Sequence, residues 1–329
     1  DRLWFTPDGL EQATRPRVAA RRAARLARTL AMVNPRSEGH AGVVVDLGCG
    51  IGADALAFAE ARLVVVAVER DEGTAVLASA NLGREVIVGE AEELWPRLAA
   101  PGVAVFADPA RRTASGRTWR VEDLSPGWPF VESLLDGTRV ACVKLGPGVP
   151  HALIPDEVEA EWVSDAGTVV ECCLWAGPGA FPGRRRAVVD GVELVGTGRL
   201  PAEGGPVGEF LYEPDGAVVR AGLVDEFAGL VKAHRLAEGI AYLSAPWNMP
   251  TPFATVFAVR EVMSYDEKIL RAWVRDRGVG TLEIKKRGLD VDPAELRRRL
   301  RPRGKGEATL VLAPTRAGAV AIVCQRVGR

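Results

Sequence analysis

The sequence of 329 residues lacks several features that mark common protein classes. No apolar run approaches the roughly 20 residues that a membrane-spanning helix needs, and the basic start has no apolar signal-peptide segment. The cysteines are odd in number and contain no C-x-x-C pair, and the three histidines lie far apart in sequence. These absences argue against disulfides, a zinc site and a membrane segment. They predict a soluble cytoplasmic protein without a metal, whose cysteines are reduced core residues.

The composition is that of a large globular protein. Hydrophobic residues make up 47% of the chain, which at this length predicts a sizeable core divided between two domains. Arginine greatly outnumbers lysine, and alanine, glycine and valine are abundant. This bias is typical of high-GC bacterial genes.

Charge is distributed unevenly along the chain. The formal net charge is -1, but residues 1–40 carry +4, residues 258–329 carry +8, and the part between them carries -13. Basic ends of this kind predict contact with a polyanion. A solvated helical face is the alternative interpretation of LRRRLRPRGK, although this run shares its segment with IKKRG.

The most informative segment is 43–54, VVVDLGCGIGAD. A β-branched apolar run ends in an acidic residue, passes through glycines at 48, 50 and 52, and enters a helical pattern. Glycines allow the backbone to turn sharply and to present N–H groups to a ligand. The segment therefore predicts a strand, a tight turn and a helix N-terminus that bind a nucleotide-like cofactor.

Two cofactors fit this turn. Gly48, Gly50 and Ala53 satisfy the dinucleotide pattern, and a second strand ends in Glu69 at a plausible ribose distance. Asp46 argues against a dinucleotide, because a carboxylate before the first glycine repels a pyrophosphate. The same carboxylate attracts the ammonium group of a methionine moiety, directly or through water. The segment DLGCGIGAD resembles motif I of the class I S-adenosylmethionine-dependent methyltransferases. NAD remains the alternative.

Strands and helices alternate through the first half of the chain. We expect strands at 43–47, 63–69, 86–88, 103–107 and 138–145, with helices at 53–61, 72–82 and 91–99 and one or two more within 9–33. This alternation predicts an α/β fold with a doubly wound, Rossmann-like parallel sheet that binds ligands at the carboxyl ends of its strands. Apolar runs at 160–163, 168–175 and 185–190 are expected to add antiparallel edge strands, as in a seven-stranded methyltransferase sheet.

The second chemical signal follows the fourth strand, where VAVFA leads into DPARR. Proline fixes its own φ and restricts the residue before it, so Asp108 and Pro109 form a rigid turn. Arg111 and Arg112 begin an arginine-containing loop suited to phosphate contacts. Asp-Pro is also a common turn dipeptide, and arginine pairs are often surface charge.

The methyltransferase resemblance implies roles for these residues. Asp108 and Pro109 occupy the place of catalytic motif IV, where Asp108 would accept a hydrogen bond from a base N–H or orient the acceptor. Glu69 would bind the ribose hydroxyls, and Glu90 would lie beside the adenine. The implied cofactor-binding set is Asp46, Gly48, Cys49, Gly50, Glu69, Arg70, Glu90, Ala91 and Asp108.

DPARR departs from related motifs in two ways. Amino-methylating enzymes usually place Pro-Pro and an aromatic after the acidic residue, but Ala110 and Arg111 stand here, so base stacking must come from elsewhere or be absent. The uridine-C5 methyltransferases use a cysteine just after the fifth strand, whereas Cys142 lies within the expected strand. Covalent attack on a uracil is therefore not expected. Lys144 lies where an acceptor-side loop would begin, with a structural turn as its alternative role.

Essentially the whole chain resembles a bacterial family of class I methyltransferases that end in a THUMP-like domain, and DPARR is also similar to that family. The resemblance rests on YEPDGAVVRAGLVDEFA, EIKKRGLDVDPAELRRRLRPRGKGEATLVL and the opening FTPDGLEQATRPRVAARRAARLA. It implies binding of structured RNA, such as rRNA or tRNA. The RNA-binding residues that it implies are Lys285, Lys286, Arg287, Arg297, Arg298, Arg301 and Arg303. Arg111 and Arg112 join this set because their loop suits phosphate contacts.

Four parts follow from these patterns: an N-terminal helical segment at 1–40, a cofactor-binding methyltransferase domain at 41–190, a connector at 191–257 and a small α/β THUMP-like RNA-binding domain at 258–329. The predicted function is transfer of a methyl group from S-adenosylmethionine to a base nitrogen in RNA. Two alternatives remain open. One is an NAD-linked oxidoreductase, and the other is a noncatalytic RNA-binding protein that keeps the cofactor fold as a scaffold.

Overall fold

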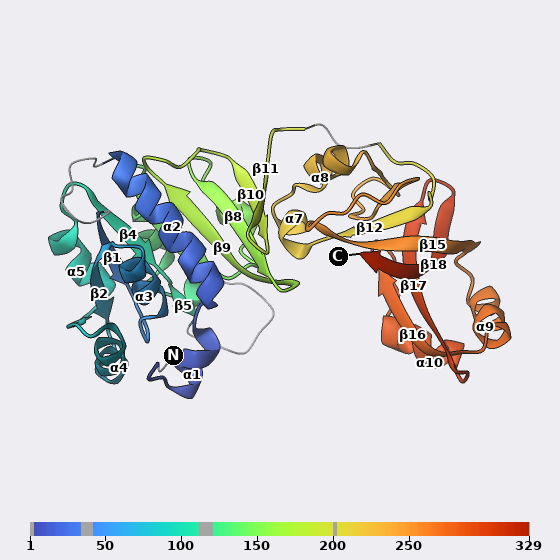
Figure 1. Cartoon of the computed structure of the whole chain (residues 1–329), viewed down its shortest axis with the longest axis horizontal. Coiled ribbons are helices and arrows are strands. Elements are labelled where there is room, and N and C mark those ends of the chain that lie inside the picture. Colours follow the sequence, from blue (N-terminus) through green and yellow to red (C-terminus); the bar gives the residue numbers. More distant parts are fainter. Residues whose placement is uncertain (1–2, 34–41, 112–120, 200–202, 329) are drawn as a thin grey trace. The chain divides into compact units, whose positions relative to one another are not determined.

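The computed structural model describes residues 3–33, 42–111, 121–199 and 203–328. They form two compact units, 1–191 and 192–329 (Figure 1). Each unit contains its own buried apolar clusters.

Among the described residues, the first sheet has nine strands in the order β11-β10-β8-β9-β7-β4-β1-β2-β3. The strands are β1 Val43–Leu47, β2 Val64–Glu69, β3 Ile87–Val88, β4 Val103–Ala107, β7 Ala141–Leu145, β8 Glu159–Asp165, β9 Thr168–Ala176, β10 Arg185–Val189 and β11 Val192–Val195. β1 pairs in parallel with both β2 and β4, and β4 pairs in parallel with β7. The carboxyl ends of β1, β2, β4 and β7 therefore meet at one edge of the sheet.

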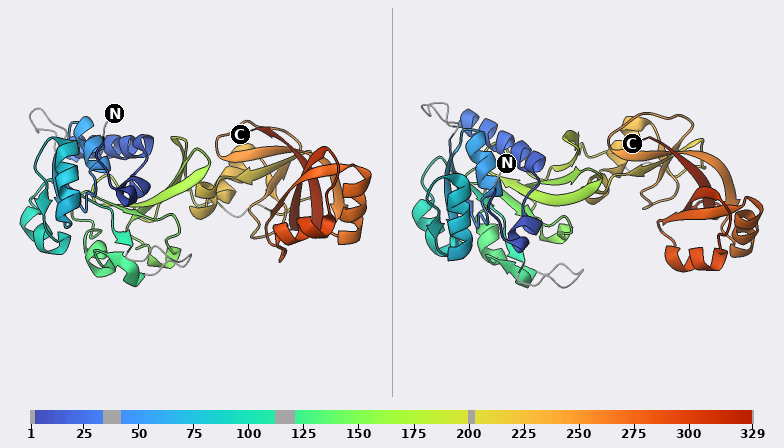
Figure 2. Two further views of the ribbon diagram at one scale, coloured as in Figure 1. Left: turned by 90° about the horizontal axis from the view of Figure 1, so that it is seen from below. Right: turned by 60° about the horizontal axis from the view of Figure 1, so that its bottom comes forward.

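The helices of this unit are α1 Pro7–Gln12, α2 Pro16–Val33, α3 Ala53–Glu60, α4 Glu72–Leu82, α5 Ala91–Leu98 and α6 Trp128–Ser133, with short 3-10 helices at Val121–Asp123 and His151–Leu153. A two-stranded ladder joins β5 Ala110–Arg111 to β6 Leu124–Ser125. Figure 2 shows α2 and α3 side by side in both views, and residues of α2, α3 and α4 share one apolar cluster with the sheet. The expected doubly wound α/β fold is confirmed.

The far side of the sheet differs in detail from the expectation. The seven-strand arrangement is present, and β10 and β11 extend it. The prediction that all three late runs are antiparallel edge strands is wrong: β9 is antiparallel to β7 and β8 but lies between them, and β10 is parallel to β8. The tight turn at Ala166 and Gly167, both with positive φ, makes β8 and β9 a hairpin. That hairpin inserts its second strand next to β7.

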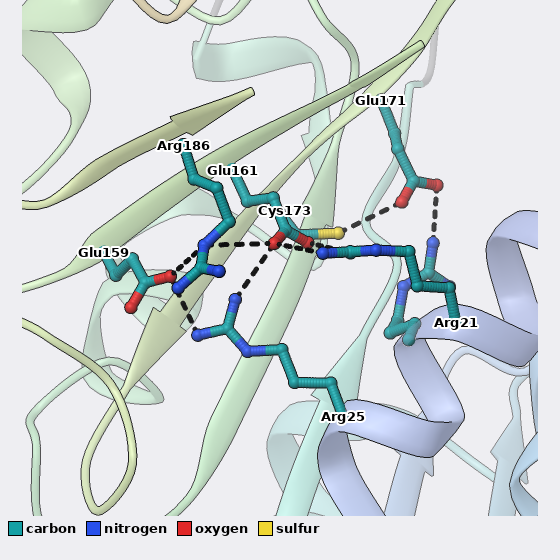
Figure 3. A network of polar contacts seen from close by, with 8 residues as sticks. Arg21, Arg25, Glu159, Glu161, Glu171, Cys173 and Arg186 are labelled. Carbon is teal, nitrogen blue, oxygen red and sulfur yellow. Dashed lines mark hydrogen bonds and ion pairs between the residues drawn. The ribbon is translucent and has the colours of Figure 1, made fainter. Parts of the chain in front are cut away.

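Helix α2 is attached to the sheet by charged as well as apolar contacts. Figure 3 shows arginines of α2 reaching the buried carboxylates of Glu159 and Glu161 on β8, which also meet Arg186 on β10. Arg21 and Arg25 both contact Glu161, at 2.8 Å and 3.1 Å. Because these carboxylates are almost fully buried, the arginines that pair with them fix the position of the helix.

The second unit is built on a seven-stranded sheet of described residues, in the order β13-β14-β12-β15-β18-β17-β16. Its elements are β12 Phe210–Pro214, α7 Gly216–Arg220, α8 Val224–Val231, β13 His234–Arg235, β14 Leu243–Ala245, β15 Ala254–Ser264, α9 Glu267–Asp276, β16 Val279–Lys286, α10 Pro293–Leu300, β17 Gly306–Thr315 and β18 Gly318–Gly328. From β12 onward, the segment 191–257, predicted to be a connector, contributes strands and helices to this unit.

Local signals explain several elements of the second unit. Asp292 caps α10 by accepting a hydrogen bond from the N–H of Glu295 at 2.8 Å, and Pro293 takes the first helical position. Helix α8 ends at Val231, because Lys232 adopts a left-handed conformation. None of the described helices combines the length and the apolar character required to cross a membrane.

Candidate active site

A cavity of the first unit lies at the carboxyl edge of its parallel strands. Its volume is about 750 Å³. The wall is formed by the turns after β1, β2, β3, β4 and β7 and by the segment around α1. Its lining includes Thr6, Gly9, Thr14, Gly48, Cys49, Gly50, Asp54, Glu69, Arg70, Asp71, Glu90, Ala91, Glu92, Asp108, Pro109 and Lys144.

The turn after β1 presents open backbone to this cavity. Gly48, Gly50 and Gly52 have φ values of 81°, 55° and 87°, a region that residues with a Cβ rarely adopt. A Cβ placed on Gly50 would have no protein atom within 4 Å. This residue therefore leaves space that a ligand can approach.

Acidic groups surround the turn. Glu69, at the end of β2, accepts hydrogen bonds from the N–H groups of Gly50 at 2.9 Å and Asp71 at 3.0 Å. Glu90 precedes α5 as its N-cap residue, and Arg70 donates to the Ser125 hydroxyl at 2.8 Å. The carboxylate oxygens of Glu69 retain lone pairs for further donors, such as ribose hydroxyls.

Asp108 follows β4 and faces the same cavity. The ammonium of Lys144, on β7, donates a hydrogen bond to Asp108 Oδ2 and to the Thr14 hydroxyl, the latter at 2.9 Å. Burial raises the pKa of Asp108, and the ammonium opposes that rise. Burial lowers the pKa of Lys144, but Asp108 and Asp54 outweigh it, so this pKa is raised and the ammonium keeps its charge.

Asp46 lies two residues after the core residue Val44 on β1, so both side chains point to the same face of the sheet. Asp46 is fully buried, and neither of its carboxylate oxygens has a hydrogen-bond partner among the described residues. Burial raises its pKa well above the ordinary value, and Asp54 and Asp108 add to the effect. Asp46 is not among the residues that line the cavity.

The structure brings together the rest of the predicted cofactor-binding set. Gly48, Cys49, Gly50, Glu69, Arg70, Glu90, Ala91 and Asp108 all line the cavity, as does Pro109. Sequence reasoning missed Thr6, Gly9, Thr14 and Asp54 in the wall. All five cysteines are free and buried, as expected. Within the described ranges, no group of three or more His, Cys, Asp and Glu residues is arranged to hold a metal.

The predicted RNA-binding residues differ in their surroundings. In the second unit Lys286, Arg297, Arg298, Arg301 and Arg303 are exposed. Lys285 is half-buried and pairs with Glu213 at 2.9 Å, and Arg287 lies over the ring of Tyr242. In the first unit Arg111 belongs to β5, but its side chain and the whole of Arg112 lie outside the described residues.

Comparison with known proteins gives the family. The chain is 35% identical over 337 aligned positions to uncharacterized S-adenosylmethionine-dependent methyltransferases from two strains of Mycobacterium tuberculosis, covering 99% of this chain and 88% of each relative. The chain belongs to the S-adenosylmethionine-dependent methyltransferases. Residues 254–326 of this methyltransferase also match the THUMP domain-like family.

A solved structure shows the same fold. A protein from Porphyromonas gingivalis assigned as a methyltransferase superposes with a TM-score of 0.77 at 20% identity, covering 99% of this chain and 84% of that one. The identity is low, so this likeness concerns the fold alone.

The cavity of this methyltransferase fits the family's cofactor. S-adenosylmethionine carries a sulfonium and an ammonium, and the wall contains more carboxylates than cations: Asp54, Glu69, Asp71, Glu90, Glu92 and Asp108 against Arg70 and Lys144. Such a wall would repel the pyrophosphate of NAD.

Proposed function

We propose that this methyltransferase transfers the methyl group of S-adenosylmethionine to a nitrogen of a base in structured RNA, such as rRNA or tRNA, in the cytoplasm. The observation that carries the proposal is the position of Asp108. Its carboxylate lines the same cavity as the glycine turn and Glu69, so a group held by Asp108 lies near a cofactor bound at the turn.

The cofactor-binding roles follow from this geometry. When bound, S-adenosylmethionine supplies an activated methyl group. The Gly48–Gly50 turn would hold the methionine part, with Cys49 in its wall and Asp46 acting on the ammonium from behind. Glu69 would accept hydrogen bonds from the ribose hydroxyls, beside Arg70, and Glu90 and Ala91 would border the adenine.

Asp108 and Pro109 would act on the acceptor. The rigid Asp-Pro turn fixes the carboxylate at the cavity wall, where it accepts a hydrogen bond from the acceptor N–H and aligns the nitrogen. The protein contributes mainly by positioning, because the methyl donor is already activated.

The THUMP-like match and the exposed cations of α10 and its flanks support RNA as the acceptor. Lys286, Arg297, Arg298, Arg301 and Arg303 would contact phosphates, with Lys285, Arg287, Arg111 and Arg112 as further contacts. Phosphate contacts of this kind suit structured RNA, which is recognised largely by shape.

Substitution of Asp108 tests the mechanism. We expect Asp108→Ala to reduce methyl transfer to total cellular RNA by about 100-fold or more, because the acceptor loses its alignment. Calorimetry should show S-adenosylmethionine affinity close to that of the wild type. Glu132→Ala, at an exposed position on α6, is the matched control and should keep full activity. Full activity in Asp108→Ala would remove Asp108 from the mechanism.

The noncatalytic alternative makes a different prediction for the same samples. A scaffold protein would retain RNA on a filter without incorporating any methyl group. An NAD-linked oxidoreductase would instead bind NAD in a parallel titration.

A further inference from the structure

The segment before α2 forms one wall of the active-site cavity. Thr6, Gly9 and Thr14 line the cavity. The backbone of Trp4 exchanges two hydrogen bonds with the Asn81 side chain of α4, at 2.7 Å and 2.8 Å. Gly9 packs so closely that a Cβ there would lie 2.8 Å from Ile51 Cγ2. The segment is therefore anchored on both α4 and the glycine turn.

The Thr14 hydroxyl connects this wall to the interior. It donates its single hydrogen to Asp54 Oδ2 at 2.6 Å and accepts from Lys144 Nζ at 2.9 Å. The other oxygen of Asp54 accepts from the buried Arg22 of α2. Because the Asp54 carboxylate can only accept, the single hydrogen of the hydroxyl is directed to it, and a lone pair of the hydroxyl is left to hold the Lys144 ammonium.

The Lys144 ammonium, held by Thr14, in turn fixes the position of the Asp108 carboxylate. Its side chain is 13% exposed, against 34% for Asp108, and it contacts Asp108 Oδ2. A methionine of similar length could fill the same space without the cost of desolvating a charge. Stability alone therefore does not explain an ammonium at this position.

We propose that Lys144 and Thr14 are positioning residues for the methyl acceptor: they hold Asp108 by its Oδ2 atom, so that Oδ1 is presented to the acceptor N–H. The N-terminal segment thus completes the active site. This inference rests on the role proposed above for Asp108.

The charges around Asp108 give the proposal a pH signature. Lys144 of β7 and Arg22 of α2 lower its pKa, whereas Asp54 of α3 raises it, and Asp46 of β1 is a further acid beside it. An ionised Asp108 accepts a stronger hydrogen bond from the acceptor N–H than a protonated one does, so we expect activity to fall as the pH drops through its pKa. Removal of the ammonium raises that pKa and moves the acidic limb of the rate profile to higher pH.

The test uses the full chain, tritiated S-adenosylmethionine and total cellular RNA, with rates measured across pH. We expect Lys144→Met and Thr14→Val to lower the transfer rate about tenfold or more, with S-adenosylmethionine Kd changed less than about threefold. The acidic limb should move to higher pH in Lys144→Met. Thr14→Ser keeps the hydroxyl and should rescue most of the rate lost in Thr14→Val. Lys268→Met, at an exposed position on α9, is the lysine control.

A second readout separates this inference from the proposed function. The Asp108 carboxyl can be titrated by ¹³C NMR in the aspartate-labelled full chain, with Asp108→Asn to assign its signal. A higher pKa in Lys144→Met supports the positioning contact even if the wild type methylates no RNA, an outcome that would overturn only the proposed function. Wild-type rates and an unchanged Asp108 titration in both Lys144→Met and Thr14→Val would overturn the inference.

Discussion

At the residue scale, the site depends on backbone conformations that few residues adopt. Gly50 and Gly83 both have positive φ, at 55° and 62°, and a Cβ on either would meet no protein atom within 4 Å. They differ in location, because Gly50 lines the cavity and Gly83 ends α4. A substitution at Gly83 therefore reports backbone strain alone, whereas the same substitution at Gly50 reports strain together with the loss of space for a ligand.

We expect Gly50→Ala and Gly83→Ala to lower the free energy of unfolding by similar amounts, about 1–2 kcal/mol, because both force a Cβ into the left-handed region. Only Gly50→Ala should also weaken S-adenosylmethionine binding, by about tenfold or more, because its methyl group enters the cavity. Urea denaturation and calorimetry measure the two effects. Equal affinity loss in both variants would show that Gly50 does not border the cofactor.

Asp46 predicts a pH dependence of stability. Its pKa is raised in the folded protein, so between the ordinary value of about 4 and the raised value the folded state binds more protons than the unfolded state. Stability of the cofactor-free protein should therefore fall as pH rises in this window. Asp46→Asn should make the slope less negative by up to about 1.4 kcal/mol per pH unit.

The measurement is urea denaturation at several pH values from about 5 to 8. Glu132→Gln, at an exposed position, should leave the slope unchanged. Identical slopes for wild type and Asp46→Asn would mean that Asp46 is ionised when buried, contrary to this account.

At the element scale, α2 carries a buried charge within its apolar stripe. Val18, Arg22, Leu26 and Leu30 follow each other at intervals of four residues, and all four are buried. The sequence predicts the helix because this spacing is local. The same spacing places Arg22 on the apolar face, which indicates that this arginine is buried. Its partners Asp54 and Glu171 could not be predicted, because they lie 32 and 149 residues away in the sequence.

We expect Arg22→Met to lower the free energy of unfolding by about 3–5 kcal/mol, because Asp54 and Glu171 stay buried without their cation. Arg17→Met is the control on the same helix: its side chain is 79% exposed beside Asp165, and its loss should cost less than about 1 kcal/mol. Chemical denaturation compares them. Equal costs would show that Arg22 does not anchor α2.

The parallel strands and the glycine turn were predictable because each signal lies within a few consecutive residues. The Asp108 turn was predictable for the same reason. The wall formed by Thr14 was not, because its contact with Lys144 spans 130 residues and depends on how α1 and α2 dock. The order of β8, β9 and β10 was not predictable either, because the β8–β9 hairpin inserts β9 beside β7 through long-range pairing.

At the scale of the whole molecule, two units have separate cores. The apolar cluster of the first unit includes Phe58 and Phe106, and those of the second include Leu296 and Phe257. The division of the chain into four domains, with boundaries at residues 40, 190 and 257, stays a prediction. The structure separates two compact units, and the boundary between them follows Gly191.

Separate cores predict two thermal transitions in scanning calorimetry. S-adenosylmethionine at about 100 times its Kd should stabilise the unit that binds it by about 2.7 kcal/mol and raise only that unit's transition. A fragment is not needed, because the full chain reports both transitions. A single transition, or an equal upward shift of both, would mean that the units unfold together.

The most direct test of the central claim is to identify the methylated product. The full chain is incubated with methyl-labelled S-adenosylmethionine and total cellular RNA, and the RNA is digested to nucleosides and separated. The account predicts label in a nucleoside methylated on a base nitrogen, and loss of that label in Asp108→Ala. Label confined to ribose or a base carbon, or no label in RNA despite cofactor binding, would contradict it.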